Sequence, residues 1–420
     1  MITQIENGGV TAPKGFKAAG YTAGFKPSGL PDLAVIVSED HSPLPAAALF
    51  TKNIVRAAPV EISEENMTKS NGKIAAIVLN SGQANAGTGA PGHQDGLETV
   101  QVAADALGCQ PENIFICSTG VIGKRFDIEK MKSAIPTVLS AAKSTLEGGF
   151  DAAKAIMTTD LRMKQTAFQD TIAGKTVTVG GMCKGSGMIH PEMATMLGVI
   201  SCDASVGRDV WQKMLKKAVD KSFNAITVDG DSSTNDVVCG LCSGASGLTI
   251  SQNSAEADAL QSLLDKTCMH LAKSIARDGE GATVLIEVQV KGAVSDEDAT
   301  RIARTVTGSS LVKAAIFGHD PNWGRIAAAA GRARADFDVS KLKISLGDHL
   351  LMEHGNPVPF DAVAASSYMK EKAEASAEHY LSDHDTVLIT IEVGNGPGEG
   401  VAWGCDLSYK YVEINAEYTT

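Results

Sequence analysis

The sequence predicts an α/β fold in which mixed and antiparallel sheets form layers with helices packed on them. Short runs rich in β-branched residues recur along the whole chain, and stretches with helical apolar periodicity lie between them. The 420 residues are 44% hydrophobic and 20% charged, an ordinary globular composition that allows a sizeable core and two lobes. Together these observations are typical of a layered mixed fold.

The predicted strands are apolar runs bounded by Gly, Asp, Asn or Ser. In one of them Val177 and Val179 alternate with Thr176 and Thr178, as expected of an antiparallel strand that is buried on one face. We predict strands over residues 33–37, 74–80, 113–117, 175–183, 197–204, 224–231, 283–290 and 386–393.

Three longer stretches carry apolar residues at intervals of three and four, which predicts amphipathic helices over 127–147, 208–223 and 255–276. Pro136 lies inside the first stretch and predicts a kink or a restart there. We expect the apolar stripe of each helix to pack on a sheet.

The chain after about residue 285 has a strand–helix–strand order of its own. This order predicts a second α/β lobe over about 286–420. Because no linker rich in Pro or Ser precedes it, we expect the two lobes to pack closely.

The charge balance argues against several classes of partner. A net charge of −12 disfavours nucleic acid or an anionic membrane surface, because phosphate groups require clustered Lys and Arg. The N-terminal residues lack the pattern of a signal peptide, and no run of about 18 apolar residues is present to span a membrane. We therefore expect a cytoplasmic protein without nucleic-acid or membrane partners.

The sequence lacks the common signatures of phosphate-loop, zinc-protease and serine-hydrolase sites. Its one CxxC motif, Cys239 and Cys242, has no second pair at zinc spacing. Two small buried residues of a strand are therefore favoured over a redox or metal pair. We expect no metal ion and no bound cofactor.

Two glycine-bearing stretches have the composition of ligand loops. Residues 180–190 combine several glycines with Lys184, which suits either a cradle for an anionic ligand or a plain connecting loop. In residues 116–123, Thr119 and Gly120 follow a predicted strand, where a backbone N–H can form an oxyanion hole. The spacing leaves the first alternative open and favours an ordinary turn for the second.

Thr195 follows Ala194 and precedes the apolar run of a predicted strand. A threonine hydroxyl acts as a nucleophile when a base is adjacent, and no local Ser/His/Asp arrangement provides one. A chain-terminal threonine can use its own α-amine, whose pKa is about 7.7–8.0. The residues alone favour a strand threonine.

A set of separated motifs resembles the glutamate N-acetyltransferases, also called ornithine acetyltransferases, a family of arginine biosynthesis. The motifs occur in family order and span nearly the whole chain. They include VTAPKGFKAAG (10–20), NSGQANAGTG (80–89), STGVIG (118–123), IMTTD (156–160), KGSGMIHPEMATML (184–197), DGDSSTND (229–236), ARDGEGAT (276–283) and WGCDLSYKYVEINAEYTT (403–420).

This resemblance implies a self-cleaving enzyme with an N-terminal-nucleophile-like fold. Cleavage between Ala194 and Thr195 would give an α chain of 1–194 and a β chain of 195–420, assembled as two α and two β chains. Thr195 would be the nucleophile, and Thr119 and Gly120 would form the oxyanion hole. The substrate contacts implied by the resemblance are Thr158, Lys184, Thr195, Glu280, Asn415 and Thr420.

The implied reaction is a ping-pong transfer of acetyl from N²-acetyl-L-ornithine to L-glutamate through an ester on Thr195. The charges suit these substrates, because Lys184 can anchor a carboxylate and Glu280 can pair with the ornithine ammonium. One departure from the family pattern is Val284, where many members carry Lys. Its position near Glu280 is expected to affect the substrate pocket.

Three alternatives stay open. A bifunctional enzyme would also take acetyl from acetyl-CoA, which would then be a substrate. A different N-terminal-nucleophile enzyme, an amidase or peptidase, would pass the acyl group to water. An uncleaved ligand-binding protein would keep Thr195 as an ordinary strand residue.

Overall fold

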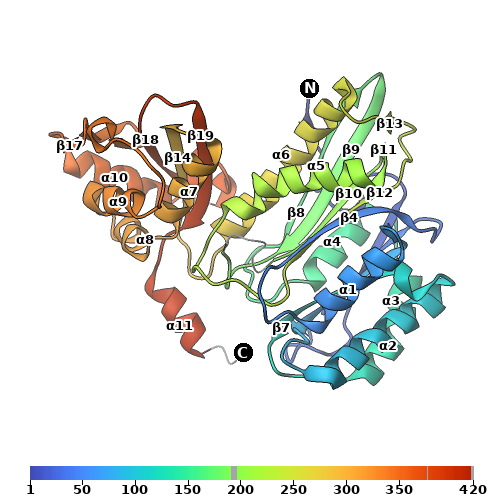
Figure 1. Ribbon diagram of the computed structural model, residues 1–420. Helices are drawn as coiled ribbons and strands as arrows, with labels where there is room; N and C mark the ends of the chain where they lie inside the picture. Colours follow the sequence, from blue (N-terminus) through green and yellow to red (C-terminus); the bar gives the residue numbers. More distant parts are fainter. Residues whose placement is uncertain (191–195, 376, 418–420) are drawn as a thin grey trace.

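Two β-sheets lie face to face in the N-terminal lobe of the computed structural model, which describes residues 1–190, 196–375 and 377–417 (Figure 1). The larger sheet contains, in spatial order, β1 (Thr3–Gln4), β8 (Lys164–Ile172), β9 (Lys175–Lys184), β10 (Leu197–Cys202), β12 (Val237–Cys242), β4 (Leu44–Phe50) and β5 (Lys73–Ile74). The smaller sheet contains β2 (Phe16–Tyr21), β3 (Leu33–Ser38), β6 (Ala76–Gln83) and β7 (Ile114–Val121).

Helices cover the outer face of each sheet, so that the N-terminal lobe has four layers (Figure 1). Apolar residues of α1 (Ala58–Lys69), α2 (Gly89–Leu107) and α3 (Ile128–Ser140) lie on the smaller sheet, and those of α5 (Arg208–Asp220) and α6 (Ala255–Arg277) lie on the larger one. A shorter helix, α4 (Leu146–Ala155), contributes to the core between the sheets. A small ribbon of β11 (Ser205–Val206) and β13 (Thr249–Ile250) completes this lobe.

The close packing of α5 on the larger sheet depends on one glycine. The fully buried indole of Trp211 donates a hydrogen bond of 2.9 Å to the carbonyl oxygen of Gly240 in β12. A Cβ atom at position 240 would lie 3.0 Å from the indole ring. Glycine there lets the helix approach the strand while the indole N–H keeps a partner.

A separate sheet of six strands forms the C-terminal lobe, with its own apolar core. Its spatial order is β17 (Asn356–Pro357), β16 (His349–Glu353), β15 (Lys343–Leu346), β18 (Thr386–Glu392), β14 (Leu285–Ala293) and β19 (Gly398–Cys405). The helices of this lobe are α7 (Asp296–Thr307), α8 (Ser310–Phe317), α9 (Trp323–Gly331) and α10 (Ala362–Ala373). The last helix, α11 (Tyr409–Glu417), leaves the C-terminal lobe and runs toward the end of β7 (Figure 1).

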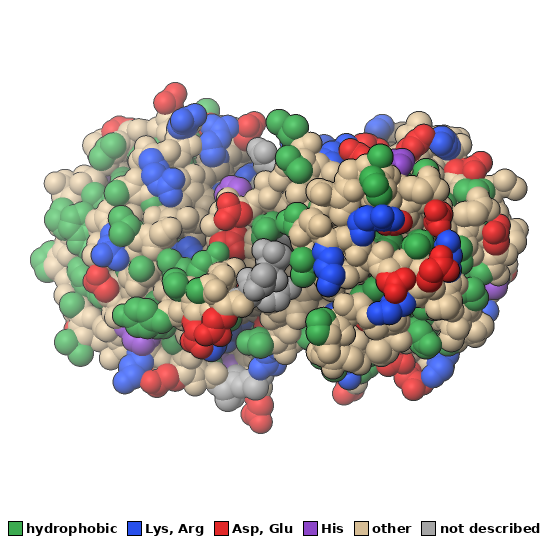
Figure 2. Space-filling view, turned by 90° about the horizontal axis from the view of Figure 1, so that it is seen from below, with side chains coloured by type: hydrophobic (Ala, Val, Ile, Leu, Met, Phe, Trp, Pro, Cys, Tyr) green, Lys and Arg blue, Asp and Glu red, His purple; other side chains and the backbone are tan. Residues whose placement is uncertain are grey.

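The predicted α/β class, with mixed and antiparallel sheets, layered helices and a second α/β lobe, is confirmed. Within the described ranges, every helix is too short or too polar to cross a bilayer. On the face seen in Figure 2, Lys and Arg side chains are interspersed with Asp and Glu side chains.

Two predicted elements were wrong. The single helix expected over 127–147 is divided, because Lys143 forms backbone hydrogen bonds of 2.9 and 3.0 Å with Ala18 of β2. Pro136 lies inside α3 without ending it. The strand expected over 224–231 is absent, because residues 223–225 form a 3₁₀ turn and the chain beyond makes only one β-bridge, from Ile226 to Trp403.

The alternation expected in β9 is also lost. Thr176 is exposed, but Thr178 is buried together with Val177 and Val179, because the inner part of this strand is covered on both faces. The backbone N–H of Thr178 donates 2.8 Å to the carboxylate of Asp203, which follows β10.

Candidate functional site

A pocket of about 100 Å³ brings together six of the residues predicted from the sequence. These residues come from segments that are far apart along the chain. They are Thr119, Gly120, Thr158, Lys184, Glu280 and Asn415. The other described lining residues are Ala84, Ile122, Thr159, Gly187, Met188, Ser233, Thr234 and Asn235.

The pocket lies where strands of the two facing sheets end. Thr119 and Gly120 are near the end of β7 in the smaller sheet, and Lys184 is the last residue of β9 in the larger sheet. Glu280 follows α6, and Asn415 reaches the pocket on α11 from the C-terminal lobe. Loop ends of this kind, carried on a packed scaffold, are frequent ligand sites.

Lys184 is the buried cation of the pocket. Its Nζ donates a hydrogen bond of 3.1 Å to Oγ1 of Thr119. Burial lowers the pKa of Lys184, and Lys164 adds to this effect, while Asp160, Asp236 and Glu280 oppose it. A carboxylate that entered the pocket would stabilise the charged ammonium and would gain a charge-assisted hydrogen bond.

Glu280 is held by one hydrogen bond to its side chain and one from its backbone. Its Oε2 accepts a hydrogen bond of 2.8 Å from Nδ2 of Asn415, and its backbone N–H donates 2.9 Å to the carbonyl oxygen of Ser186. A Cβ atom at Gly187 would lie 2.4 Å from the same Oε2. The glycine therefore leaves room for an acidic group in the pocket wall.

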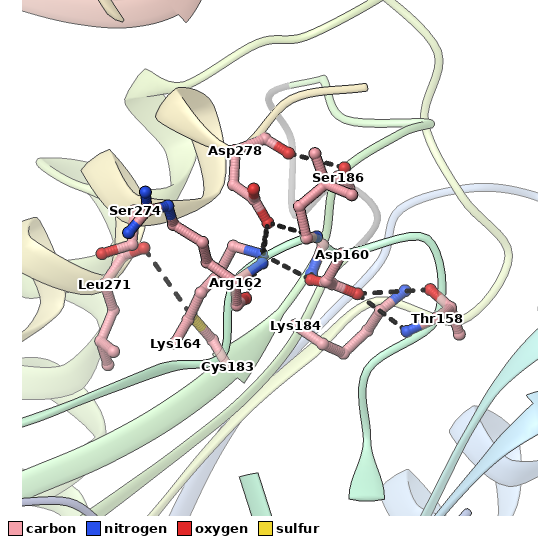
Figure 3. A network of polar contacts seen from close by, with 12 residues as sticks. Thr158, Asp160, Arg162, Lys164, Cys183, Lys184, Ser186, Leu271, Ser274 and Asp278 are labelled. Carbon is pink, nitrogen blue, oxygen red and sulfur yellow. Dashed lines mark hydrogen bonds and ion pairs between the residues drawn. The ribbon is translucent and has the colours of Figure 1, made fainter. Parts of the chain in front are cut away.

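A buried ion triad lies next to Thr158 and Lys184, two residues that line the pocket (Figure 3). The Nζ of Lys164 is 2.6 Å from Oδ1 of Asp160 and 2.6 Å from Oδ2 of Asp278. It also donates 3.2 Å to the carbonyl oxygen of Arg162. One cation thus joins the loop that follows α4 to the C-terminal end of α6.

Both acids of the triad also form hydrogen bonds with the segments that carry Thr158 and Lys184. Asp160 accepts 2.9 Å from the N–H of Thr158 and 2.8 Å from the N–H of Gly185. The backbone carbonyl of Asp278 accepts 2.6 Å from the hydroxyl of Ser186. These bonds fix the chain that directly follows Lys184 relative to Thr158.

The pKa values of Asp160 and Asp278 shift in opposite directions in this buried triad. Burial would raise the pKa of Asp160, but the ammonium groups of Lys164 and Lys184 outweigh it and hold that pKa well below its usual range. For Asp278, burial outweighs the pairing with Lys164 and raises its pKa. The pairing with both acids raises the pKa of Lys164 in spite of its burial.

Ala194, Thr195 and Thr420 lie outside the described residues, but the chain on both sides of the predicted cleavage is firmly held. The carboxylate of Asp229 accepts 2.5 Å from the N–H of Met188 and 2.9 Å from that of Ile189. On the other side, the carbonyl oxygen of Met196 accepts 3.1 Å from the N–H of Val237.

The expected influence of Val284 on the pocket was wrong. Its side chain is buried in the core of the C-terminal lobe, and its backbone N–H donates 3.2 Å to Asp406. Val284 is not among the described residues that line the pocket.

Comparison with known proteins decides the family. The model of the ArgJ family matches residues 17–420. The arginine biosynthesis bifunctional protein ArgJ of Synechococcus sp. is 55% identical over 415 residues, covering 99% of this chain and 98% of the relative. The chain belongs to the ArgJ family. The resemblance seen in the sequence motifs is thereby confirmed.

Two solved structures of ArgJ proteins are also similar in sequence. The arginine biosynthesis bifunctional protein argJ of Bacillus halodurans is 40% identical over 52% of this chain and 97% of that chain, with a TM-score of 0.48. Ornithine acetyltransferase of Mycobacterium tuberculosis, solved with ornithine, is 40% identical over 46% of this chain and 98% of that chain, with a TM-score of 0.42.

Sequence reasoning missed the charged residues that support the pocket of this ArgJ-family chain. Lys164 and Asp278 were not predicted, although Asp160 and Asp278 fall in the motifs IMTTD and ARDGEGAT. Lys26 was also missed. Burial lowers the pKa of Lys26 to about 8, with Asp32 and Asp160 opposing and Lys184 adding to the shift.

We expect Gly120→Ala to disrupt the pocket edge. Gly120 has φ +126°, and a Cβ atom there would lie 2.3 Å from the backbone carbon of Gly82 in β6. The strained backbone and the clash should lower the free energy of unfolding by about 3 kcal/mol or more, measured by denaturant titration.

Gly123→Ala is the matched control for this substitution. Gly123 also has a positive φ, +79°, but among the described residues no atom beyond its two chain neighbours lies within 4 Å of the added Cβ. Gly123→Ala should lower the free energy of unfolding by about 1 kcal/mol, because only the left-handed backbone conformation is unfavourable for alanine there. Equal losses for the two variants would contradict the close contact between β6 and β7.

Proposed function

We propose that this protein transfers acetyl from N²-acetyl-L-ornithine to L-glutamate through an ester on Thr195, after the chain has cut itself between Ala194 and Thr195. The single observation that carries the proposal is the convergence of Lys184, Glu280 and Asn415 with Thr119 in one pocket. These residues offer a buried cation and an acid to an amino acid. The ornithine complex of the Mycobacterium tuberculosis relative supports the substrate class.

The proposed cleavage begins with attack of the Thr195 hydroxyl on the carbonyl carbon of Ala194. The bond from this carbonyl carbon to the Thr195 nitrogen breaks as the new ester bond forms, and the nitrogen takes up the hydroxyl proton. Water then hydrolyses the ester, which leaves a carboxylate on Ala194 and a free amine on Thr195. That amine serves as the base in the later acetyl transfers.

In turnover the Thr195 hydroxyl attacks the acetyl carbonyl of acetylornithine, and its proton passes by way of the α-amine to the departing ornithine amine. The backbone at Thr119 and Gly120 would stabilise the oxyanion. The α-amine of glutamate then attacks the ester, and acetylglutamate leaves as the Thr195 hydroxyl regains its proton. The substrate carboxylate would bind Lys184, whose Nζ is already 3.1 Å from Oγ1 of Thr119.

A two-part experiment tests this proposal. Denaturing electrophoresis of the purified protein should show two chains of roughly half the full length. The protein should form acetylglutamate from acetylornithine and glutamate faster than it releases acetate to water. A single full-length chain, or release of acetate as the main reaction, would overturn the proposal.

We expect Glu280→Gln to weaken binding of acetylornithine much more than binding of glutamate. If Glu280 pairs with the side-chain ammonium of ornithine, loss of its charge should raise KM for acetylornithine about tenfold or more. KM for glutamate should change much less. Initial-rate kinetics with each substrate varied in turn will measure both values, and an equal rise in both would contradict the pairing.

Asn415→Asp is a useful companion variant for this test. The bond from Nδ2 of Asn415 to Glu280 would become a contact between two carboxyl groups. We expect repulsion between the two carboxyl groups to displace the side chain of Glu280 and to raise KM for acetylornithine. An unchanged KM would argue against a role of Asn415 in holding Glu280.

A second candidate activity is the synthesis of acetylglutamate from acetyl-CoA and glutamate. The observation that favours it is the name "bifunctional protein" carried by the Synechococcus relative at 55% identity. Formation of acetylglutamate with acetyl-CoA as the sole donor would support this activity, and its absence would leave acetylornithine as the donor. The proposal includes a cytoplasmic enzyme of two α and two β chains, which fractionation and sedimentation can test.

A further inference from the structure

One buried carboxylate beside the pocket has no hydrogen-bond donor among the described residues. Asp236 directly precedes β12 and is 1% exposed. Neither of its carboxylate oxygens accepts a hydrogen bond from any part of the chain that the structure describes. Its backbone carbonyl is satisfied, because it accepts 2.9 Å from the N–H of Thr51. An unpaired buried carboxylate is costly, so it calls for a partner.

The other buried acids near the pocket differ from Asp236 in this respect. Asp160 and Asp278 share Lys164 and also accept backbone N–H groups. Asp229 accepts three backbone N–H groups, and Glu280 accepts the amide of Asn415. Asp236 alone among these five acids is left without a donor within the described ranges.

The register of two neighbouring strands places Asp236 beside Met196. Strands β10 and β12 are parallel neighbours in which Leu197 is paired with Val237. Met196 and Asp236 therefore lie side by side just before these strands begin, and Met196 accepts 3.1 Å from the N–H of Val237. Met196 is bonded directly to Thr195, the residue that the proposed cleavage would make a chain terminus.

Electrostatics agree with a missing cationic partner. Burial raises the pKa of Asp236 well above its usual value. The backbone N–H groups of Met196 and Ser233, the hydroxyl of Ser233 and the ammonium of Lys184 lie near enough to lower it in part. None of these groups meets either carboxylate oxygen at the distance and angle of a hydrogen bond. A further positive donor on this side would stabilise the ionised form.

We propose that Asp236 is a positioning residue for acetyl transfer, whose carboxylate accepts hydrogen bonds from the α-amino group created at Thr195 by cleavage. This inference rests on the proposed function. An intact peptide at this point has one N–H, which belongs to the backbone, whereas a free amino group has two or three N–H donors. The acceptor that is unpaired beside the intact chain gains its donor when the chain is cut.

The consequence for catalysis is orientation of the base. A hydrogen bond from the amino group to Asp236 would fix rotation about the bond between its nitrogen and Cα, so that the lone pair points to the threonine hydroxyl. Orientation of this kind affects the rate of the bound complex more than substrate affinity. The carboxylate would also raise the pKa of the amino group.

The test compares Asp236→Asn with the wild type in the full chain. Because the amino group does not exist before cleavage, Asp236→Asn should still be cut into two chains. Its kcat for transfer from acetylornithine to glutamate should fall about tenfold or more, with both KM values within about twofold. The acidic limb of its kcat–pH profile should move to lower pH, because the amine loses a neighbouring negative charge.

Asp203→Asn is the matched control, because Asp203 is a buried carboxylate at the opposite end of β10 and burial also raises its pKa. It accepts backbone N–H groups of Thr178 and Lys14 and lines no part of the pocket. It should leave the kcat–pH profile unchanged. A profile shift of equal size in Asp203→Asn would overturn the specific role of Asp236.

Three results would count against the inference. Unchanged kcat and pH profile in cleaved Asp236→Asn would overturn it while the proposed function stood. Failure of a folded Asp236→Asn chain to cleave would also overturn it, because Asp236 would then act before the amine exists. A wild-type chain that stays uncut would overturn the proposed function itself.

A measurement on the wild type covers the case in which Asp236→Asn does not fold. The pKa of the terminal amine of the β chain can be obtained from the pH dependence of its labelling by acetic anhydride, followed by mass spectrometry. We expect a value above the roughly 7.7–8.0 of a free α-amine. A value at or below that range would overturn the inference.

Discussion

Thr195→Ala is expected to give a single full-length chain without detectable acetyl transfer. The substitution removes the hydroxyl that would attack the Ala194 carbonyl and would later carry the acetyl group. Loss of a nucleophile that acts with its base typically lowers the rate by on the order of 10⁴-fold or more. Denaturing electrophoresis and an acetylglutamate assay on the same preparation will measure both effects.

Thr195→Ser is the control, because it keeps the hydroxyl and removes only a methyl group. We expect it to be cut, more slowly than the wild type, and to retain measurable transfer. Cleavage of Thr195→Ala at the same site would contradict the role of the Thr195 hydroxyl, since another group would then make the attack. Transfer of acetyl at the wild-type rate by the uncut Thr195→Ala chain would contradict that role as well.

Lys164→Met should produce the largest loss of stability among the substitutions considered. The Nζ of Lys164 is 2.6 Å from each of two buried carboxylates, and the side chain of Lys164 is itself buried. Removing one partner of a buried ion pair typically costs about 3–5 kcal/mol. Urea titration should show this decrease in the free energy of unfolding, together with weaker substrate binding as Thr158 and Gly185 lose their fixed positions.

Lys69→Met is the matched control. Lys69 forms an ion pair of 2.7 Å with Glu65 on the exposed surface of α1. Exposed pairs contribute about 0–1 kcal/mol. A loss at Lys164 no larger than that at Lys69 would contradict the structural role assigned to the triad.

The pH dependence gives an independent check on the triad. The pKa of Asp160 is lowered in the folded protein, so its stabilising contribution is complete above the unfolded value of about 3.9 and is lost as the pH falls through the lower folded value. In Lys164→Met the pKa of Asp160 should rise, and the acid-induced loss of stability should begin at higher pH. An unchanged acid transition would argue against the pairing with Lys164.

Much of the fold could be predicted from local patterns, and the failures have physical causes. The apolar stripes over 208–223 and 255–276 correctly predicted which faces of α5 and α6 are buried, because these helices cover one side of a sheet. The break between α3 and α4 was not predictable locally, since it depends on hydrogen bonds between Lys143 and Ala18, which are distant in sequence. Tertiary pairing overrode the helical pattern there.

The candidate site was predictable to a different extent. Its lining residues could be named because separated motifs matched one family, and the fold brings six of them into one pocket. The supporting charges could not be named, because a buried Lys164 looks like any surface lysine until both acids are placed around it. The position of the Asp236 carboxylate beside Met196 could not be predicted either, because it depends on the register of β10 and β12.

The most direct test of the central claim is the intact mass of the β chain after exposure to acetylornithine in the absence of glutamate. We predict a gain of one acetyl group, located on the terminal Thr195 by fragmentation and removed when glutamate is added. No gain in mass, an acetyl group on another residue, or an acetyl group that glutamate does not remove would contradict that claim.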